Sequence, residues 1–135
     1  MVQGDILCVG KHLYYDYREH FPGCGYFTLD INPELKPDIV ADIQDCKLPE
    51  KSYDGIMVTG MYECIADWDK AINEIYRILK DNGWLLVTFA GEGFFKGTTK
   101  PEEVFKKALP FRVCELYVTY YKNGNVEYLS AICKK

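Results

Sequence analysis

The sequence lacks several features that would place it at a membrane or on nucleic acid. No apolar run approaches the ~18 residues that a membrane-spanning helix needs, and no basic segment of a secretory signal opens the chain. Positive charge is not in surplus: 16 Lys and Arg against 20 Asp and Glu give a net charge of −4. Nucleic-acid-binding surfaces are normally basic. We therefore expect neither a membrane nor DNA as a partner.

The sequence also lacks paired cysteines, although it contains six. They lie far apart, and no two form the CxxC pair of zinc sites and redox motifs. Three of them, Cys8, Cys114 and Cys133, fall inside apolar segments, where a free thiol behaves as a small hydrophobic side chain. His12 and His20 have no carboxylate at ligand spacing. We expect free thiols, no metal and a cytoplasmic protein, because disulfides are rare in the cytosol.

Length and composition predict one globular domain over residues 1–135. A chain of 135 residues is long enough to bury roughly two thirds of its unfolded surface without help from metals or disulfides. Hydrophobic residues make up 48% of it, which is typical of a folded domain. We find no linker, repeat or low-complexity segment.

Four short apolar runs dominate the first half of the sequence. They are rich in β-branched and aromatic residues and are bounded by Gly, Pro, Asn or Asp, as is typical of strands buried on both faces of a parallel sheet. The runs end at Gly10, Asp30, Asp42 and the Thr59-Gly60 pair. Ligands of open α/β sheets bind outside the carboxyl ends of the strands. These four positions therefore predict a binding site.

Asp30 has the chemistry for a ribose. A carboxylate at the end of a second strand can accept hydrogen bonds from both ribose hydroxyls. The alternative is that Asp30 only begins the Asn32-Pro33 turn. Only seven residues with two prolines separate Asp30 from Asp38, so we expect an extended return to a neighbouring strand in place of a crossover helix.

The central part of the sequence predicts a helix followed by a strand. Apolar residues recur at spacings of three and four over residues 68–79, with Asp67 as N-cap and Gly83 as the end of the helix. Residues 84–89 then read as a buried strand. An earlier helix is expected over residues 11–21, ended by a Pro-Gly pair.

The last third predicts a short helix and a hairpin. Thr99 and Glu102 have the spacing of a capping box ahead of a helix that ends at Pro110. Asn123-Gly124 lies between two alternating segments, which is a strong pattern for a β-hairpin.

The order of these segments resembles the class I S-adenosylmethionine-dependent methyltransferases, in particular the small methyltransferase domain 11 type. The resemblance implies an α/β fold: a doubly wound, Rossmann-like, mostly parallel sheet with a carboxyl-terminal antiparallel hairpin. It also implies S-adenosylmethionine as cofactor and methyl transfer to a small molecule or a protein group. The segments that carry it are DILCVG, YFTLDINPE, PDIVADIQDCKLPEKSYDGIMVTGMYE and DWDKAINEIYRILKDNGWLLVTFAG.

The resemblance further implies roles for single residues. Gly10 matches a glycine where the missing side chain lets the methionine part of the cofactor approach the backbone. Asp30 matches the acid that holds the ribose, and Asp42 with the Ile43 backbone matches the pair that reads the adenine amino group. For Asp42 the alternative is a helix or turn cap. The positions that match the lining near the methyl group are Thr59, Gly60 and Met61.

Methyl transfer makes small demands on acid-base groups. It is an in-line displacement that gains most from holding the nucleophile and the methyl carbon in line at ~3 to 3.5 Å. Where the acceptor needs a general base, Tyr62 and Glu92 are the catalytic candidates, and Glu63 is more simply a capping or solvated side chain.

The glycine loop departs from the family pattern of acid-x-Gly-x-Gly-x-Gly. Cys8, Gly10, His12 and Tyr14 occupy these positions, so one glycine is kept and the acid is lost. This favours a second hypothesis, a non-catalytic methyltransferase-like binding or assembly module. A dinucleotide enzyme is disfavoured, because no GxGxxG follows the first strand. Helices that cover the substrate in the family have no counterpart before residue 5, so we expect a second copy or a partner protein to cover the open site.

Overall fold

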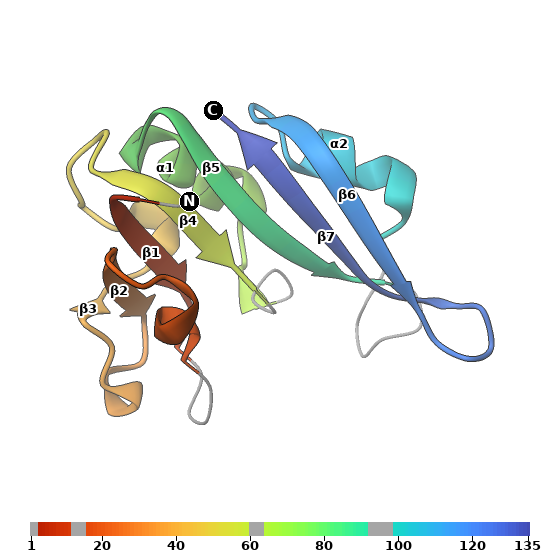
Figure 1. Cartoon of the computed structure of the whole chain (residues 1–135), viewed down its shortest axis with the longest axis horizontal. Helices are drawn as coiled ribbons and strands as arrows, with labels where there is room; N and C mark the ends of the chain where they lie inside the picture. Colours follow the sequence, from red (N-terminus) through yellow and green to blue (C-terminus); the bar gives the residue numbers. More distant parts are fainter. Residues whose placement is uncertain (1–2, 12–15, 60–63, 92–98) are drawn as a thin grey trace.

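One twisted sheet organises the structure, a computed structural model that describes residues 3–11, 16–59, 64–91 and 99–135 (Figure 1). Within these ranges the sheet has seven strands in the order β3-β2-β1-β4-β5-β7-β6. The strands are β1 (Asp5–Val9), β2 (Gly25–Asp30), β3 (Ile39–Val40), β4 (Tyr53–Val58), β5 (Leu79–Ala90), β6 (Arg112–Tyr120) and β7 (Val126–Lys134).

The strand directions confirm the expected fold class. β1 pairs in parallel with β2 and with β4. The pairs β2–β3 and β4–β5 are also parallel. β7 pairs antiparallel with both β5 and β6. The sheet is therefore Rossmann-like and mostly parallel, with an antiparallel hairpin at its carboxyl-terminal side.

The register brings the strand exits to one edge of the sheet. Val9 pairs with Leu29 and with Val58, and Asp30 pairs with Val40. The residues that follow these strands therefore leave the sheet side by side, as the four apolar runs predicted.

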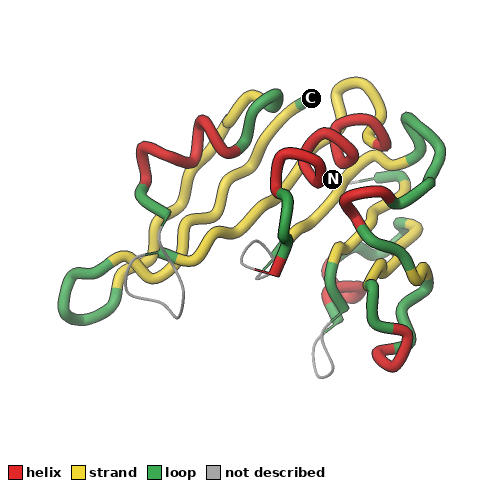
Figure 2. The backbone as a smooth tube through the Cα atoms, turned by 180° about the vertical axis from the view of Figure 1, so that it is seen from behind, coloured by secondary structure: helices red, strands yellow, loops and turns green. Residues whose placement is uncertain are grey.

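The two α-helices of the described residues cover the same face of the sheet. Both α1 (Trp68–Ile78) and α2 (Val104–Lys107) lie behind the strands in Figure 1 and in front of them in Figure 2, which shows the molecule from the opposite side. α1 inserts buried Ile72 and Ile75 into the main core. The 3₁₀ helices are η1 (Tyr17–His20), η2 (Pro33–Leu35), η3 (Ile43–Asp45) and η5 (Pro101–Glu103).

The opposite face carries a smaller core. Ile6, Cys8, Tyr26 and Met57 are buried there, and Tyr17 of η1 and Phe21, which follows η1, pack against them. The expected double winding is therefore uneven in the described residues, with the helical cover concentrated on one face.

The helix at the centre of the chain starts as predicted and ends earlier. The Asp67 carboxylate caps α1 by accepting from the Lys70 backbone N–H at 3.2 Å. The predicted end at Gly83 is wrong: Leu79 is already extended at ψ 140° and pairs with Tyr53 of β4. Strand pairing thus takes over from the helix before the glycine is reached.

The predicted capping box is also wrong. Lys100 is the N-cap of η5 and makes no side-chain cap bond. The Thr99 hydroxyl instead accepts a hydrogen bond from Lys107 Nζ at 2.6 Å. A contact between residues at the two ends of the η5–α2 segment replaces the local one that the spacing suggested.

The helix expected over residues 11–21 is a single short turn in its described part. η1 spans Tyr17–His20, and the Asp16 carboxylate caps it by accepting from the Arg18 backbone N–H at 2.8 Å. Residues 12–15 lie outside the described residues.

Two predicted connections are confirmed. The chain between Asp30 and Asp38 contains only η2, and β3 returns in parallel beside β2. At the hairpin, Gly124 has φ +90° and the Tyr121 N–H donates to the Asn125 carbonyl at 2.8 Å.

All six cysteines are free thiols, as expected. Cys8 and Cys133 are buried, but Cys114 is exposed, because it lies on β6 at the edge of the sheet. The small-hydrophobe interpretation is therefore wrong for Cys114. Among the described residues, no helix has the length and apolar character needed to cross a membrane.

Candidate functional site

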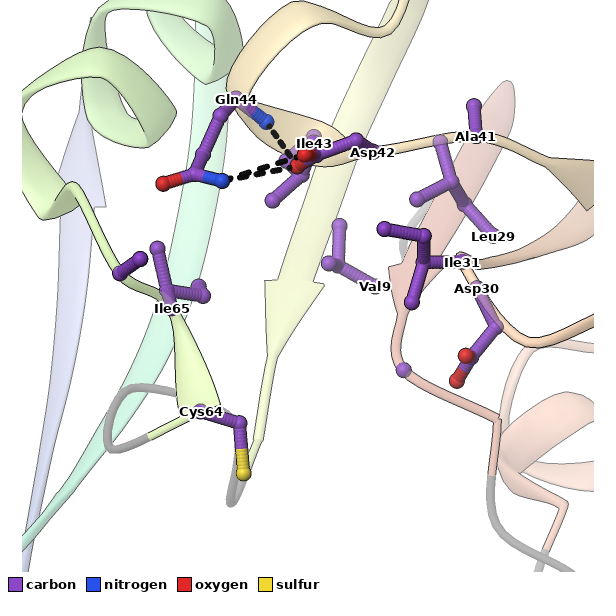
Figure 3. Close-up of a pocket in the computed structure, with 12 residues that line it drawn as sticks. Val9, Leu29, Asp30, Ile31, Ala41, Asp42, Ile43, Gln44, Cys64 and Ile65 are labelled. Carbon is purple, nitrogen blue, oxygen red and sulfur yellow. Dashed lines mark hydrogen bonds between the residues drawn. The ribbon is translucent and has the colours of Figure 1, made fainter.

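A pocket of about 120 Å³ lies at the edge of the sheet where the strands exit (Figure 3). Four of the residues predicted from the sequence line it together: Gly10, Asp30, Asp42 and Ile43. The remaining lining residues are Val9, Leu29, Ile31, Ala41, Gln44, Cys64, Ile65 and Ala66.

The exit of β1 is held close to β2 by backbone hydrogen bonds. Gly10 has φ +90°, a conformation that side-chain-bearing residues rarely adopt. Its N–H donates to the Leu29 carbonyl at 2.7 Å. A glycine is thus required where the chain turns out of β1, and the pocket begins at this turn.

Asp30 is a buried carboxylate with both oxygens engaged by the backbone. It is 8% exposed. Oδ2 accepts from the Lys11 N–H at 2.9 Å, and Oδ1 accepts from the Asn32 N–H at 2.9 Å. The turn role that the sequence offered as an alternative is therefore present. Each carboxylate oxygen has further acceptor capacity, so the ribose role stays a prediction that this geometry permits.

Asp42 likewise serves as a cap. Its Oδ1 accepts from the Gln44 backbone N–H at 2.9 Å at the start of η3. The neighbouring Ile43 is 5% exposed and anchors η3 in the main core. The alternative of a turn cap is confirmed for Asp42, and its adenine role stays a prediction.

Thr59 follows β4 and carries an unsatisfied polar atom. Its Oγ1 is buried without a hydrogen-bond partner, and no other side-chain N or O atom of the described residues is in this state. Buried hydroxyls are nearly always paired, so a polar group from a ligand would complete Thr59. It does not line the pocket described above. The other predicted residues near the methyl group and the catalytic candidates lie outside the described residues: Gly60, Met61, Tyr62 and Glu92.

The position of the lost family acid carries no charge. Cys8 is 2% exposed, and burial raises the pKa of its thiol above the ordinary value. Its Sγ donates to the Gly10 carbonyl at 3.6 Å, so it also steadies the turn. The negative charge of the pocket is then supplied by Asp30 and Asp42.

Gln44 and the apolar walls were missed by the sequence reasoning. Ile31, 65% exposed, and Ile65 flank the two carboxylates with hydrocarbon surface. Gln44 donates its side-chain amide to Asp42. An aspartate side chain often accepts a hydrogen bond from the backbone two residues later, as in an Asx turn. Applied to Asp42, this pattern could have singled out Gln44.

The comparisons identify the class to which this fold and pocket belong. Residues 9–87 match the family model described as a methyltransferase domain. The match covers more than half of the chain, and the chain belongs to this family. This confirms the expected class I methyltransferase family, and with it S-adenosylmethionine as the cofactor. No curated protein matches the sequence.

Solved methyltransferase structures share the fold at low identity. The N-methyltransferase NodS from Bradyrhizobium japonicum WM9, in complex with S-adenosyl-L-homocysteine, has a TM-score of 0.79 and 16% identity over 98% of this chain and 78% of that one. A methyltransferase from Mesorhizobium loti has a TM-score of 0.78 and 11% identity, covering 97% and 90%. One from Methanosarcina mazei has a TM-score of 0.77 and 15% identity, covering 97% and 92%.

The residues present fit the cofactor of this family. Gly10 lines the pocket with backbone alone, at a φ of +90°. Two carboxylates keep acceptor capacity, and the Thr59 hydroxyl lacks a partner in the described structure. These features belong to the chain itself and are independent of the likeness to other structures.

Proposed function

We propose that this chain binds S-adenosylmethionine at the strand-exit pocket and transfers its methyl group to a small molecule or a protein group. The observation that carries the proposal is the convergence of Gly10, Asp30, Asp42 and Ile43 on one pocket in a methyltransferase-domain chain. The cover of the site by a second copy or a partner protein belongs to the same proposal.

Each site residue has one task in this proposal. Asp30 accepts hydrogen bonds from the ribose hydroxyls, and Asp42 with the Ile43 backbone holds the adenine amino group. Gly10 admits the methionine part. The bound cofactor supplies an electrophilic methyl group on a sulfonium, and the acceptor must be aligned with it. The residues proposed to line or assist that reaction are Thr59, Gly60, Met61, Tyr62 and Glu92.

A calorimetric titration with S-adenosylmethionine and S-adenosylhomocysteine tests the proposal. Wild type binds both, and Asp30→Ala weakens both about tenfold or more, because hydrogen bonds to a charged acceptor contribute about 1.5–3 kcal/mol. Asp81→Ala removes the same charge from an exposed position paired with Lys51, and it leaves both affinities unchanged.

The titration also decides between the two hypotheses of function. Wild-type protein that releases no heat with millimolar cofactor, while its thermal unfolding stays cooperative, overturns the proposal. That result would favour the non-catalytic binding or assembly module, for which the altered glycine loop is the supporting observation.

A further inference from the structure

The side chain of Gln44 connects two walls of the pocket. Its Nε2 donates to both carboxylate oxygens of Asp42, at 3.1 and 3.2 Å (Figure 3). Its Oε1 accepts from the Asp67 backbone N–H at 2.5 Å. A carboxylate only accepts and a backbone N–H only donates, so this orientation of the amide is the one that satisfies both partners.

The first wall is the Asp42 carboxylate, which Gln44 holds twice. The Gln44 backbone N–H donates to Oδ1 at 2.9 Å, and the side-chain amide reaches both oxygens. A carboxylate restrained from two directions has little rotational freedom. Oδ2 receives only the side-chain bond among the described contacts, and it keeps acceptor capacity for a ligand.

The second wall is the segment that leads into α1. Cys64, Ile65 and Ala66 line the pocket, and Asp67, the N-cap of α1, follows them directly. The bond from Gln44 to the Asp67 N–H therefore fixes where this segment ends. One amide thus sets both the orientation of the acid and the position of the wall beside it.

We propose that Gln44 is a positioning residue that selects adenine over hypoxanthine through Asp42. This rests on the proposed function, in which Asp42 holds the adenine amino group. Adenine presents an amino donor where hypoxanthine presents a carbonyl acceptor. A restrained carboxylate accepts a hydrogen bond from the adenine amino group and repels the hypoxanthine carbonyl. A mobile carboxylate can rotate away from that carbonyl, so it discriminates less between the two bases.

Gln44→Glu distinguishes the two contacts that the side chain makes. The new side chain keeps an oxygen for the Asp67 N–H, but it replaces the donor to Asp42 with a second negative charge. The pocket wall stays attached, and the acid loses the side-chain bonds while it keeps the bond from the backbone N–H of residue 44. Gln3→Glu is the matched control, because Gln3 is exposed and lies beside Asp54 and Lys80, away from the pocket residues.

The experiment measures the affinities of S-adenosylhomocysteine and S-inosylhomocysteine by calorimetry. Wild type and Gln3→Glu prefer the adenine compound. In Gln44→Glu the affinity for S-adenosylhomocysteine falls about tenfold, equivalent to 1.4 kcal/mol, and the preference for adenine narrows. Wild type that binds neither compound refutes the proposed function itself, which distinguishes that failure from failure of the Gln44 inference.

A second background keeps the inference testable if Gln44→Glu unfolds. Asp42→Asn combined with Gln44→Glu exchanges the amide and the carboxylate, so the bond between them is retained with reversed polarity. This double variant binds S-adenosylhomocysteine no more weakly than Asp42→Asn alone, because the effect of Gln44 passes through Asp42. A folded Gln44→Glu whose adenine preference and affinity stay within twofold of wild type overturns the inference. A tenfold loss of affinity for S-adenosylhomocysteine when Gln44→Glu is added to Asp42→Asn overturns it as well.

Discussion

Asp30 shows how one side chain can organise the backbone and still present a ligand-binding group. Its two oxygens fix the first residue after Gly10 and the start of the turn before η2. Both bonds come from the main chain, so they depend little on which side chains surround them. The carboxylate is therefore fixed in place before any ligand arrives, which reduces the entropy that binding must overcome.

Cys64 provides a direct chemical test of pocket occupancy. It is exposed and lines the pocket, whereas Cys114 is exposed on β6 at the sheet edge. Saturation with S-adenosylhomocysteine at ten times its dissociation constant slows alkylation of Cys64 by iodoacetamide about tenfold, since only the free protein reacts. Peptide mass spectrometry follows both thiols. Equal slowing at Cys114, or none at Cys64, would place the ligand elsewhere.

At the residue scale, the sequence could predict strand-end positions but not the contacts between them. Gly10, Asp30 and Asp42 were found because strands in a parallel sheet end at one edge and polar residues interrupt their apolar runs. The bond from Gln44 to Asp67 joins residues 23 positions apart. No local spacing encodes such a pair, because it exists only once η3 has packed against α1.

Among the elements, α1 contacts the loop before β4 through a partly buried cluster of Glu74, Arg77 and Cys46. Arg77 donates to both oxygens of Glu74, at 2.8 and 2.9 Å. The Cys46 thiol donates to the same carboxylate at 3.3 Å. The hydrogen bonds from Arg77 hold the pKa of Glu74 below its ordinary value of 4.5. The charged form of Glu74 is thus favoured by folding.

This cluster predicts an acid-dependent contribution to stability. A lowered pKa in the folded state means that the stabilisation is present above pH 4.5 and is lost as the pH falls below it. Glu74→Gln therefore lowers the free energy of unfolding by about 1 kcal/mol at pH 7, and the difference from wild type shrinks toward pH 3. Urea unfolding at both pH values measures it. The control Glu102→Gln alters an exposed carboxylate, and a gap that persisted at pH 3 would contradict the assignment.

The element boundaries show where local patterns lose to tertiary contacts. The N-cap Asp67 was predictable, because capping involves residues three apart. The end of α1 was not, because pairing of Leu79 with Tyr53 decides it. The capping box failed for the same reason, since Lys107 engages Thr99.

In the molecule as a whole, the two faces of the sheet are unequal. α1, η3 and α2 cover one face, whereas aromatic residues around η1 cover part of the other. Phe21 stacks on both Tyr26 and Trp84, with ring centroids 6.1 Å apart in each pair. The mostly parallel sheet and the hairpin were predictable from the family resemblance and the Asn123-Gly124 pair, but this imbalance depends on packing between elements far apart in the sequence.

Phe21 should therefore contribute more to stability than its partial exposure suggests. Phe21→Ala lowers the free energy of unfolding by about 1–2 kcal/mol, less than the 3–5 kcal/mol of a fully buried phenylalanine, because it uncovers the second core. Phe105→Ala, at a position 54% exposed on α2, changes it by less than about 0.5 kcal/mol. Thermal or urea unfolding compares the two variants, and equal losses would show that Phe21 does not protect that core.

The position of β7 between β5 and β6 has a consequence for synthesis on the ribosome. β7 is translated after both of its neighbours, yet it joins them in the sheet. While residues 126–134 are still in the exit tunnel, β5 presents a long unpaired edge that is ready to pair with other nascent chains. Chaperone demand during translation should therefore peak between the emergence of β5 and the emergence of β7.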